Sequence, residues 1–233
     1  MKNKWIWILV AVLLVCNIGL VGYLVTREDT PVSVTCDADR FKSEYEALNS
    51  KDNGYGGKHL AISIPTDNAI EYVDSTRVKQ LLTNGTGIIY FGFPECPWCR
   101  NMVPTLIDVA AEYDMKIFYL NNKSERDTIK LGEDGKVNME KEGSADYYDI
   151  LELLGEHASV YGGLNDDTIK RLYFPTVVFV KDGEIVGFHE GTVDSQEDAS
   201  VYIDANQQKE LKNILRGYFN KLKDERCPAK EKC

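Results

Sequence analysis

The sequence predicts an α/β domain that follows a single membrane-spanning helix. Three observations lead to this prediction. Short apolar runs with strand character alternate with longer amphipathic stretches of helical period. Two of the later runs are separated only by Asp182-Gly183, a dipeptide typical of a two-residue hairpin turn. Residues 5–25 form an uncharged, mostly apolar stretch that is long enough to span a bilayer.

The apolar stretch at 5–25 is expected to be an uncleaved anchor. Lys2 and Lys4 precede it and mixed charges follow it, so the N-terminus is predicted to be cytoplasmic. A cleaved signal peptide is the alternative, but the stretch is longer than a usual signal core and lacks an Ala-x-Ala-like exit. The predicted location is therefore the cell membrane, single-pass, with the folded domain on the extracytoplasmic side.

Length and charge limit the organisation and the partners. With 233 residues, one elaborated domain is expected rather than two. The net charge of −10, from 27 basic and 37 acidic residues, argues against a nucleic-acid partner. The predicted parts are an anchor at 1–27, a polar stalk at 28–58, a folded domain at 59–225 with an insertion at about 122–168, and a tail at 226–233.

The elements of the domain follow from periodicity and capping signals. Strands are expected at 60–64, 69–73, 88–93 and 115–120, followed by a hairpin of 177–180 and 184–188. Helices are expected at 39–48 in the stalk, from Ser75 to Leu82, after Cys96, from Ser144 to Gly155, and at 200–223. The helix after Ser144 belongs to the insertion. Its apolar face either packs on the domain or forms a lid over the active site.

The motif Cys96-Pro97-Trp98-Cys99 joins the apolar run 88–93 to a stretch of helical period. Both cysteines therefore fall on the first turn of an amphipathic helix. The unpaired N–H groups at a helix N-terminus favour an anion, so the pKa of Cys96 should be lowered. Cys99, one turn later, can close a disulfide with Cys96 or resolve a mixed disulfide. This context indicates a redox centre.

The cysteine pair has two other interpretations. A zinc site needs a second ligand pair, but the chain has no second Cys-x-x-Cys and only three histidines. A static structural bridge is the other alternative. Neither needs the pair to stand between a strand and a helix, so redox chemistry is favoured, with no metal or organic cofactor.

Downstream, Phe174-Pro175-Thr176 leads into the predicted hairpin, with a proline at the start of its first strand. Together with the Cys96 motif, this resembles the thioredoxin superfamily. The resemblance implies a thioredoxin-like fold, which is a central mixed sheet flanked by helices, here with a helical insertion. It also implies a cis-proline at Pro175 against the active disulfide, a helix-kinking proline at Pro104 and a strand-ending glycine at Gly191.

More narrowly, the stretches 90–99 and 171–176 look like the bacteriocin transport accessory group of Gram-positive thioredoxin-like proteins. Two departures from thioredoxins proper stand out. The dipeptide between the cysteines is Pro-Trp rather than Gly-Pro, and the family's buried acid six residues before the first cysteine is replaced by Tyr90. Glu95 is a candidate proton acceptor for Cys99, or else an ordinary solvated residue.

The resemblance implies a thiol-disulfide oxidoreductase acting on cysteines of exported proteins or peptides. Cys96 is the expected nucleophile, Cys99 closes the cycle and Pro175 presents the substrate backbone. The expected substrate-contacting residues are Pro97, Trp98 and Phe174. A membrane redox partner would recharge the pair, and the opposing charges of Glu95 and Arg100 suggest an intermediate potential. The alternative is a non-enzymatic binding or chaperone accessory of a peptide (bacteriocin) export system.

Three further cysteines lie near the ends of the predicted extracytoplasmic part, at Cys36, Cys227 and Cys233. In an oxidising compartment they form an odd set for pairing among themselves. A bridge between Cys227 and Cys233, or between Cys36 and the tail, would staple the chain ends. A second redox pair in the tail is the alternative.

Overall fold

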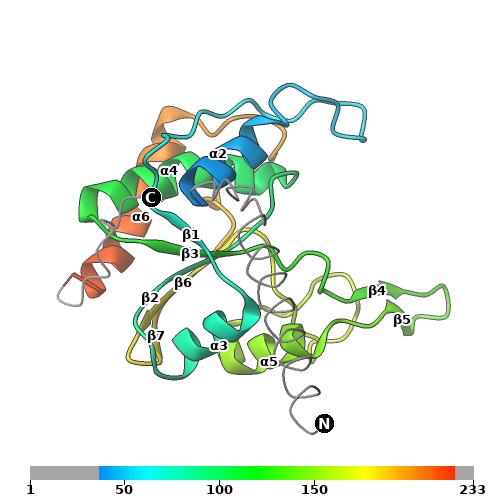
Figure 1. The fold of residues 1–233 in the computed structure, drawn as a ribbon. Coiled ribbons are helices and arrows are strands. Elements are labelled where there is room, and N and C mark those ends of the chain that lie inside the picture. Colours follow the sequence, from blue (N-terminus) through cyan, green and yellow to red (C-terminus); the bar gives the residue numbers. More distant parts are fainter. Residues whose placement is uncertain (1–36, 224–233) are drawn as a thin grey trace, which may run out of the picture. The chain divides into compact units, whose positions relative to one another are not determined.

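The computed structural model describes residues 37–223, which form a five-stranded sheet with helices on both faces (Figure 1). The strand order is β1-β3-β2-β6-β7. The strands are β1 Ile70–Tyr72, β2 Gly87–Phe91, β3 Ile117–Leu120, β6 Thr176–Lys181 and β7 Glu184–Glu190. The helices are α2 Asp37–Glu46, α3 Ser75–Asn84, α4 Pro97–Tyr113, α5 Ala145–Leu154, the short 3-10 helix η1 Gly155–His157, and α6 Ala205–Lys221.

The sheet is mixed. Strand β3 pairs in parallel with both β1 and β2, whereas β6 pairs antiparallel with β2 and with β7. Every residue of β2 is buried, as expected for a central strand covered on both faces. The predicted α/β class, with a mixed sheet flanked by helices, is confirmed.

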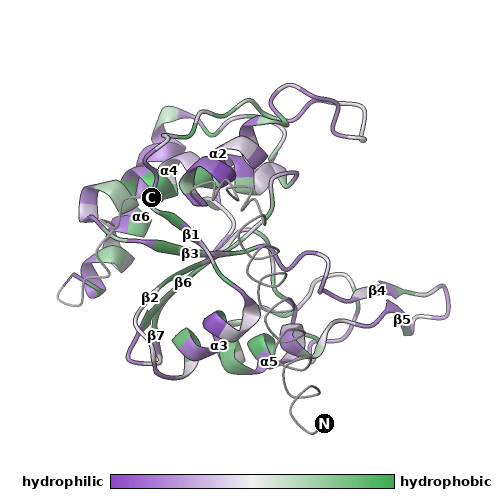
Figure 2. Cartoon of the chain, viewed as in Figure 1, coloured by the Kyte–Doolittle hydropathy of each residue, from purple (hydrophilic) through white to green (hydrophobic). Residues whose placement is uncertain are grey.

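Two apolar cores lie on opposite faces of the sheet. Helices α2, α4 and α6 cover one face, where Ile88 and Tyr90 of β2 point. Helices α3 and α5 cover the other, toward which Ile89 and Phe91 point. This alternation along one strand is the period of two that a pleated sheet imposes. In Figure 2 the hydrophobic residues accordingly gather on the central strands, and the helices carry hydrophilic residues as well.

The predicted hairpin is confirmed as β6–β7. Its turn residues Asp182 and Gly183 both have positive φ, 51° and 81°, as a type I′ turn requires. A Cβ at Gly183 would lie 2.2 Å from the carbonyl oxygen of Thr83, so only glycine fits this close approach.

The helix ends differ from prediction in two places. Asp74, not Ser75, caps α3, since its side chain accepts from the Arg77 amide at 2.8 Å. Helix α6 begins only at Ala205, after a capping box formed by Asp204 and Gln207. Ser144 caps α5 as predicted, accepting from the Tyr147 amide at 3.1 Å.

The predicted stalk at 28–58 is wrong from residue 37 onward. Helix α2 packs on the sheet, and its Phe41 and Tyr45 side chains are completely buried in the core. The strand predicted at 60–64 is also wrong, although Ile62 and Ile64 are buried. The Ile62 amide and carbonyl bond to the Asn49 side chain, at 3.0 and 2.8 Å, instead of to a neighbouring strand.

The insertion is not purely helical. It also contains a hairpin of β4 Thr128–Leu131 and β5 Val137–Lys141, which projects away from the main sheet (Figure 1). Helix α5 packs against α3, and its Tyr147, Ile150 and Leu154 are completely buried. The apolar face of this helix therefore packs on the domain and does not form a lid.

Among residues 37–223, no helix combines the length and apolar character that a membrane crossing requires. The predicted anchor at 1–27 lies outside the described residues. So do Cys36, Cys227, Cys233 and the predicted tail.

Candidate active site

Cys96 and Cys99 stand at the start of α4, as the sequence predicts. Cys96 is the N-cap, with extended backbone angles, and Pro97 occupies the first helical position, where a missing N–H costs nothing. The Cys96 sulfur accepts a hydrogen bond from the Cys99 amide at 3.3 Å. Both residues are free thiols. The structure therefore shows a reduced cysteine pair at a helix N-terminus.

The environment of Cys96 favours its thiolate. A hydrogen bond from the Cys99 thiol lowers the pKa of Cys96 most, helped by the backbone amides of Cys99 and Trp98 and by the positive charge of Lys123. Burial opposes these effects, but the net direction is downward. Cys96 is 5% exposed, whereas Cys99 is completely buried.

Cys99 has the opposite character. Burial raises its pKa well above the usual value, and the hydrogen bond to Cys96 and the charge of Cys96 add to the rise. A thiol of lowered pKa followed by a completely buried thiol of raised pKa is the asymmetry expected of a nucleophile and its resolving partner.

A pair of phenols lies on the sheet side of Cys99. Tyr90 of β2 and Tyr45 of α2 are both completely buried, and their hydroxyls are 3.0 Å apart. The Tyr90 hydroxyl acts on the buried Cys99 thiol by hydrogen bonding and lowers its pKa, partly offsetting burial. A Cβ at Gly92 would meet the Tyr90 oxygen at 2.2 Å, so glycine at 92 makes room for this hydroxyl.

The phenols cannot act as a general base. Burial raises the pKa of Tyr90 and Tyr45 well above the usual value, so both stay protonated. Tyr90 can only donate to a Cys99 thiolate. Glu95, the predicted acceptor candidate, is 52% exposed at its side chain and lies 3.7 Å from Lys123 Nζ. This geometry favours the solvated alternative for Glu95.

Arg100 does not offset Glu95, contrary to expectation. Its side chain is buried and donates to the carbonyls of Leu60 and Tyr45, in the N-terminal part of the domain, and to that of Pro94. Lys123 takes the predicted role of Arg100, because its ammonium faces both Glu95 and, at 4.3 Å, the Phe93 ring. No local motif points to Lys123, which follows β3 and is distant from the Cys96 motif in the chain.

The segment at Pro175 lies against the cysteine pair, as the resemblance implies. The Phe174-Pro175 peptide bond is cis. The Cys96 thiol donates to the Phe174 carbonyl oxygen at 3.6 Å, and the Gly191 amide donates to the Pro175 carbonyl at 2.9 Å. The ring of Phe174 meets that of Phe93 edge to face.

A buried ion pair supports this segment from the other side. Arg171 Nη2 lies 2.6 Å from Asp127 Oδ1, and both side chains are only 6% exposed. Asp127 belongs to the loop after β3, and Arg171 precedes Phe174 by three residues. The pair therefore ties the insertion to the chain that carries Pro175. Neither residue was singled out from the sequence, because only the fold brings them together.

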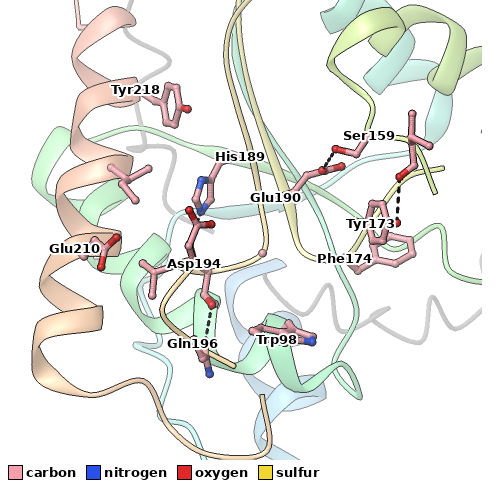
Figure 3. A pocket seen from close by; sticks show the side chains of 15 residues that line it. Trp98, Ser159, Tyr173, Phe174, His189, Glu190, Asp194, Gln196, Glu210 and Tyr218 are labelled. Carbon is pink, nitrogen blue, oxygen red and sulfur yellow. Dashed lines mark hydrogen bonds between the residues drawn. The ribbon is translucent and has the colours of Figure 1, made fainter. Parts of the chain in front are cut away.

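A pocket of about 780 Å³ is lined in part by Trp98, which stands between the two cysteines in the chain (Figure 3). Trp98 and Phe174, both predicted to contact substrate, line it, whereas Pro97 is exposed and does not. Residues from the end of β7, the loop after it and α6 complete the walls. They include His189, Glu190, Asp194, Gln196, Glu210 and Tyr218.

No protein-family model matches this chain, and no curated protein matches it significantly.

Proposed function

We propose that this protein is a thiol-disulfide oxidoreductase of thioredoxin-like fold. The observation that carries the proposal is the position of the Cys96 sulfur, which caps α4 and faces the Phe174 carbonyl beside the cis Pro175. This places a thiol of lowered pKa next to a backbone segment where a substrate chain can lie.

The topology supports the proposed fold. A parallel β2–α4–β3 unit, an antiparallel β6–β7 hairpin and a cis-proline just before β6 occur in the chain order of that superfamily. Pro104 lies inside α4, and Gly191, with a φ of 73°, follows the last strand, as the resemblance implies.

The reaction can be written from the reduced pair. The Cys96 thiolate attacks one sulfur of a substrate disulfide, forming a mixed disulfide and releasing the other sulfur as a thiolate. Cys99 then attacks the Cys96 sulfur, the mixed disulfide breaks, and the proton of Cys99 leaves with the departing substrate thiol. The first substrate thiolate takes up the proton that Cys96 had released to solvent, so the substrate gains two electrons and two protons and the pair becomes a disulfide. The reverse sequence oxidises a substrate dithiol.

The roles of the other residues follow from their positions. Pro175 and the Phe174 carbonyl would align the substrate backbone, while Trp98 would contact residues beside its cysteine. In the proposed setting, the predicted anchor at 1–27 holds the domain outside the cytoplasm. The substrates would then be exported proteins or peptides, and a membrane partner would restore the redox state of Cys96 and Cys99.

Trapping of mixed disulfides tests the proposal. The full-length Cys99→Ala variant cannot resolve a mixed disulfide, so it should accumulate adducts that are disulfide-linked through Cys96. These adducts are detected on non-reducing gels and disappear on reduction. The matched Cys96→Ala variant should trap none. Equal, negligible trapping by both variants would contradict the proposal and favour the non-enzymatic binding or chaperone alternative.

The direction of electron flow needs a second measurement. Equilibration of the pair with glutathione buffers gives its reduction potential. A value near that of thioredoxin, about −270 mV, would indicate a reductase, whereas a more positive value would indicate an oxidase or isomerase.

A further inference from the structure

The pocket beside the redox pair has the position of a substrate subsite. Trp98, between the two cysteines in the chain, forms part of its wall, and so does Phe174, whose carbonyl is 3.6 Å from the Cys96 sulfur. A polypeptide joined to Cys96 would therefore extend residues next to its cysteine along this pocket. The chemistry of the pocket walls would then decide which substrate sequences react fastest.

The walls are acidic. Glu190 ends β7, Asp194 lies in the following loop and Glu210 lies on α6, so two stretches of the chain bring carboxylates to one pocket (Figure 3). No lysine or arginine occurs among the described residues that line it. His189 compensates little, because burial lowers its pKa and so favours the neutral ring.

Glu190 is a pocket carboxylate whose hydrogen bonding is incomplete. One of its oxygens accepts a hydrogen bond from Ser159 Oγ. The other, Oε1, is buried and has no hydrogen-bond partner among residues 37–223. A buried oxygen of this kind is destabilising until a donor reaches it. None of the three carboxylates forms an ion pair within the described part of the chain.

Aromatic rings complete the surface. Trp98, Tyr173, Phe174 and Tyr218 line the same pocket. Flat rings suit the methylene stem of lysine or the plane of an arginine guanidinium, and their faces attract the positive charge. Carboxylates and aromatic rings together are complementary to a long cationic side chain.

We propose that this pocket binds a lysine or arginine side chain near the reacting cysteine of the substrate polypeptide, so that the protein favours cysteines with cationic neighbours. The redox part of this inference rests on the proposed function. The binding part rests only on the pocket.

The first experiment compares disulfide-bonded peptides that differ only beside the cysteine, with lysine, glutamine or glutamate there. The lysine is placed in turn at each of several positions on both sides. With full-length protein, kcat/KM should be highest for lysine and lowest for glutamate at the position that meets the pocket. A preference of about 3- to 10-fold is expected from one partly shielded charge pair, and salt should reduce it.

Matched variants locate the preference. Glu190→Gln and Glu210→Gln should each reduce the lysine-to-glutamate ratio of kcat/KM, and together should nearly abolish it. Glu184→Gln is the control, because Glu184 lies at the other end of β7, is exposed and does not line the pocket. It removes the same charge from the same strand and should leave the ratio unchanged. Because the readout is a ratio of two substrates, a general loss of activity does not affect it.

A binding measurement separates this inference from the proposed function. Full-length Cys96→Ser/Cys99→Ser protein should bind a fluorescent, cysteine-free lysine peptide more tightly than its glutamate counterpart. Glu190→Gln should weaken that binding even if no redox activity exists. The inference is overturned if the wild-type protein shows no lysine preference in either assay, or if Glu184→Gln reduces the preference as much as Glu190→Gln. If Cys99→Ala traps no mixed disulfides but the protein still binds the lysine peptide selectively, only the proposed redox function is overturned.

Discussion

The buried Asp127–Arg171 pair gives the sharpest stability prediction. Asp127 Oδ1 lies 2.6 Å from both Nε and Nη2 of Arg171, and each side chain is only 6% exposed. In Asp127→Asn the guanidinium would keep its buried position but lose its counter-charge. Arg126, whose pKa is lowered by burial and by the charge of Arg171, lies nearby and adds repulsion.

The expected cost is large. Removing one partner of a buried, hydrogen-bonded ion pair typically costs about 3–5 kcal/mol, because the remaining charge is desolvated without compensation. For a domain of this size, about 2–4 °C of melting temperature is lost per kcal/mol, so a drop of roughly 6–20 °C is expected. Urea unfolding should show a lower midpoint with an unchanged slope.

An exposed pair on the insertion hairpin provides the control. Lys130 and Glu140 form an ion pair at 2.8 Å, but their side chains are 67% and 45% exposed. Glu140→Gln should therefore cost under about 1 kcal/mol. The double change Asp127→Asn/Arg171→Gln should cost less than the sum of its two single changes. If Asp127→Asn is no more destabilising than Glu140→Gln, the reasoning about burial is refuted.

Three further predictions concern protonation. Iodoacetamide should label Cys96 of the reduced protein at pH values where Cys99 stays unmodified, as peptide mapping would show; equal labelling would contradict the assigned roles. Tyr90→Phe removes a hydroxyl that stabilises the Cys99 thiolate, so the alkaline labelling curve of Cys99 should shift upward by about 1–2 pH units; an unshifted curve would count against that contact. Hydrogen bonds from Arg216, with help from Lys212, lower the pKa of Glu112 from 4.5 to about 2. The stability that the ionised Glu112 contributes is present above pH 4.5 and is lost as the pH falls toward 2. In urea unfolding, Glu112→Gln should therefore lower the free energy of unfolding by under about 1 kcal/mol at neutral pH, and this difference from the wild type should shrink between pH 4.5 and pH 2.

Features set by neighbouring residues could be predicted from the sequence. The Asp182-Gly183 turn, the Ser144 cap and the placement of Cys96 at a helix start each depend on a few adjacent side chains and their backbone preferences. Even here the choice between Asp74 and Ser75 as the cap of α3 was missed, because both residue types cap well and only the entry of the chain decides between them.

Features that depend on distant contacts could not be predicted. The polar composition around α2 indicated a stalk, yet two aromatic residues, Phe41 and Tyr45, bind this helix to the sheet. The apolar alternation at 60–64 indicated a strand, but its backbone is satisfied by Asn49 and Glu46 side chains. Such side-chain to backbone bonds have no periodicity for a sequence analysis to detect.

The same distinction applies to the candidate site. The motif and Pro175 were found because their local sequence is distinctive, whereas Lys123 and the acidic residues of the pocket come from four different segments. The sequence marks Tyr90 only as the residue that stands where the resembling family has a buried acid. That it hydrogen-bonds Tyr45 depends on α2, which the sequence had assigned to the stalk.

These contacts indicate how the reactivity of the pair is controlled. The lowered pKa of Cys96 depends first on the Cys99 thiol and on backbone amides of α4, and Lys123, the cation that contributes, is exposed and close to Glu95. Cys99 has a neutral phenol rather than a carboxylate on its sheet side. The donors that lower the pKa of either thiol are thus mainly uncharged, and salt does not screen them. The reduction potential of the pair should accordingly respond little to ionic strength, whereas the proposed binding of a cationic side chain in the adjacent pocket should weaken as salt is added.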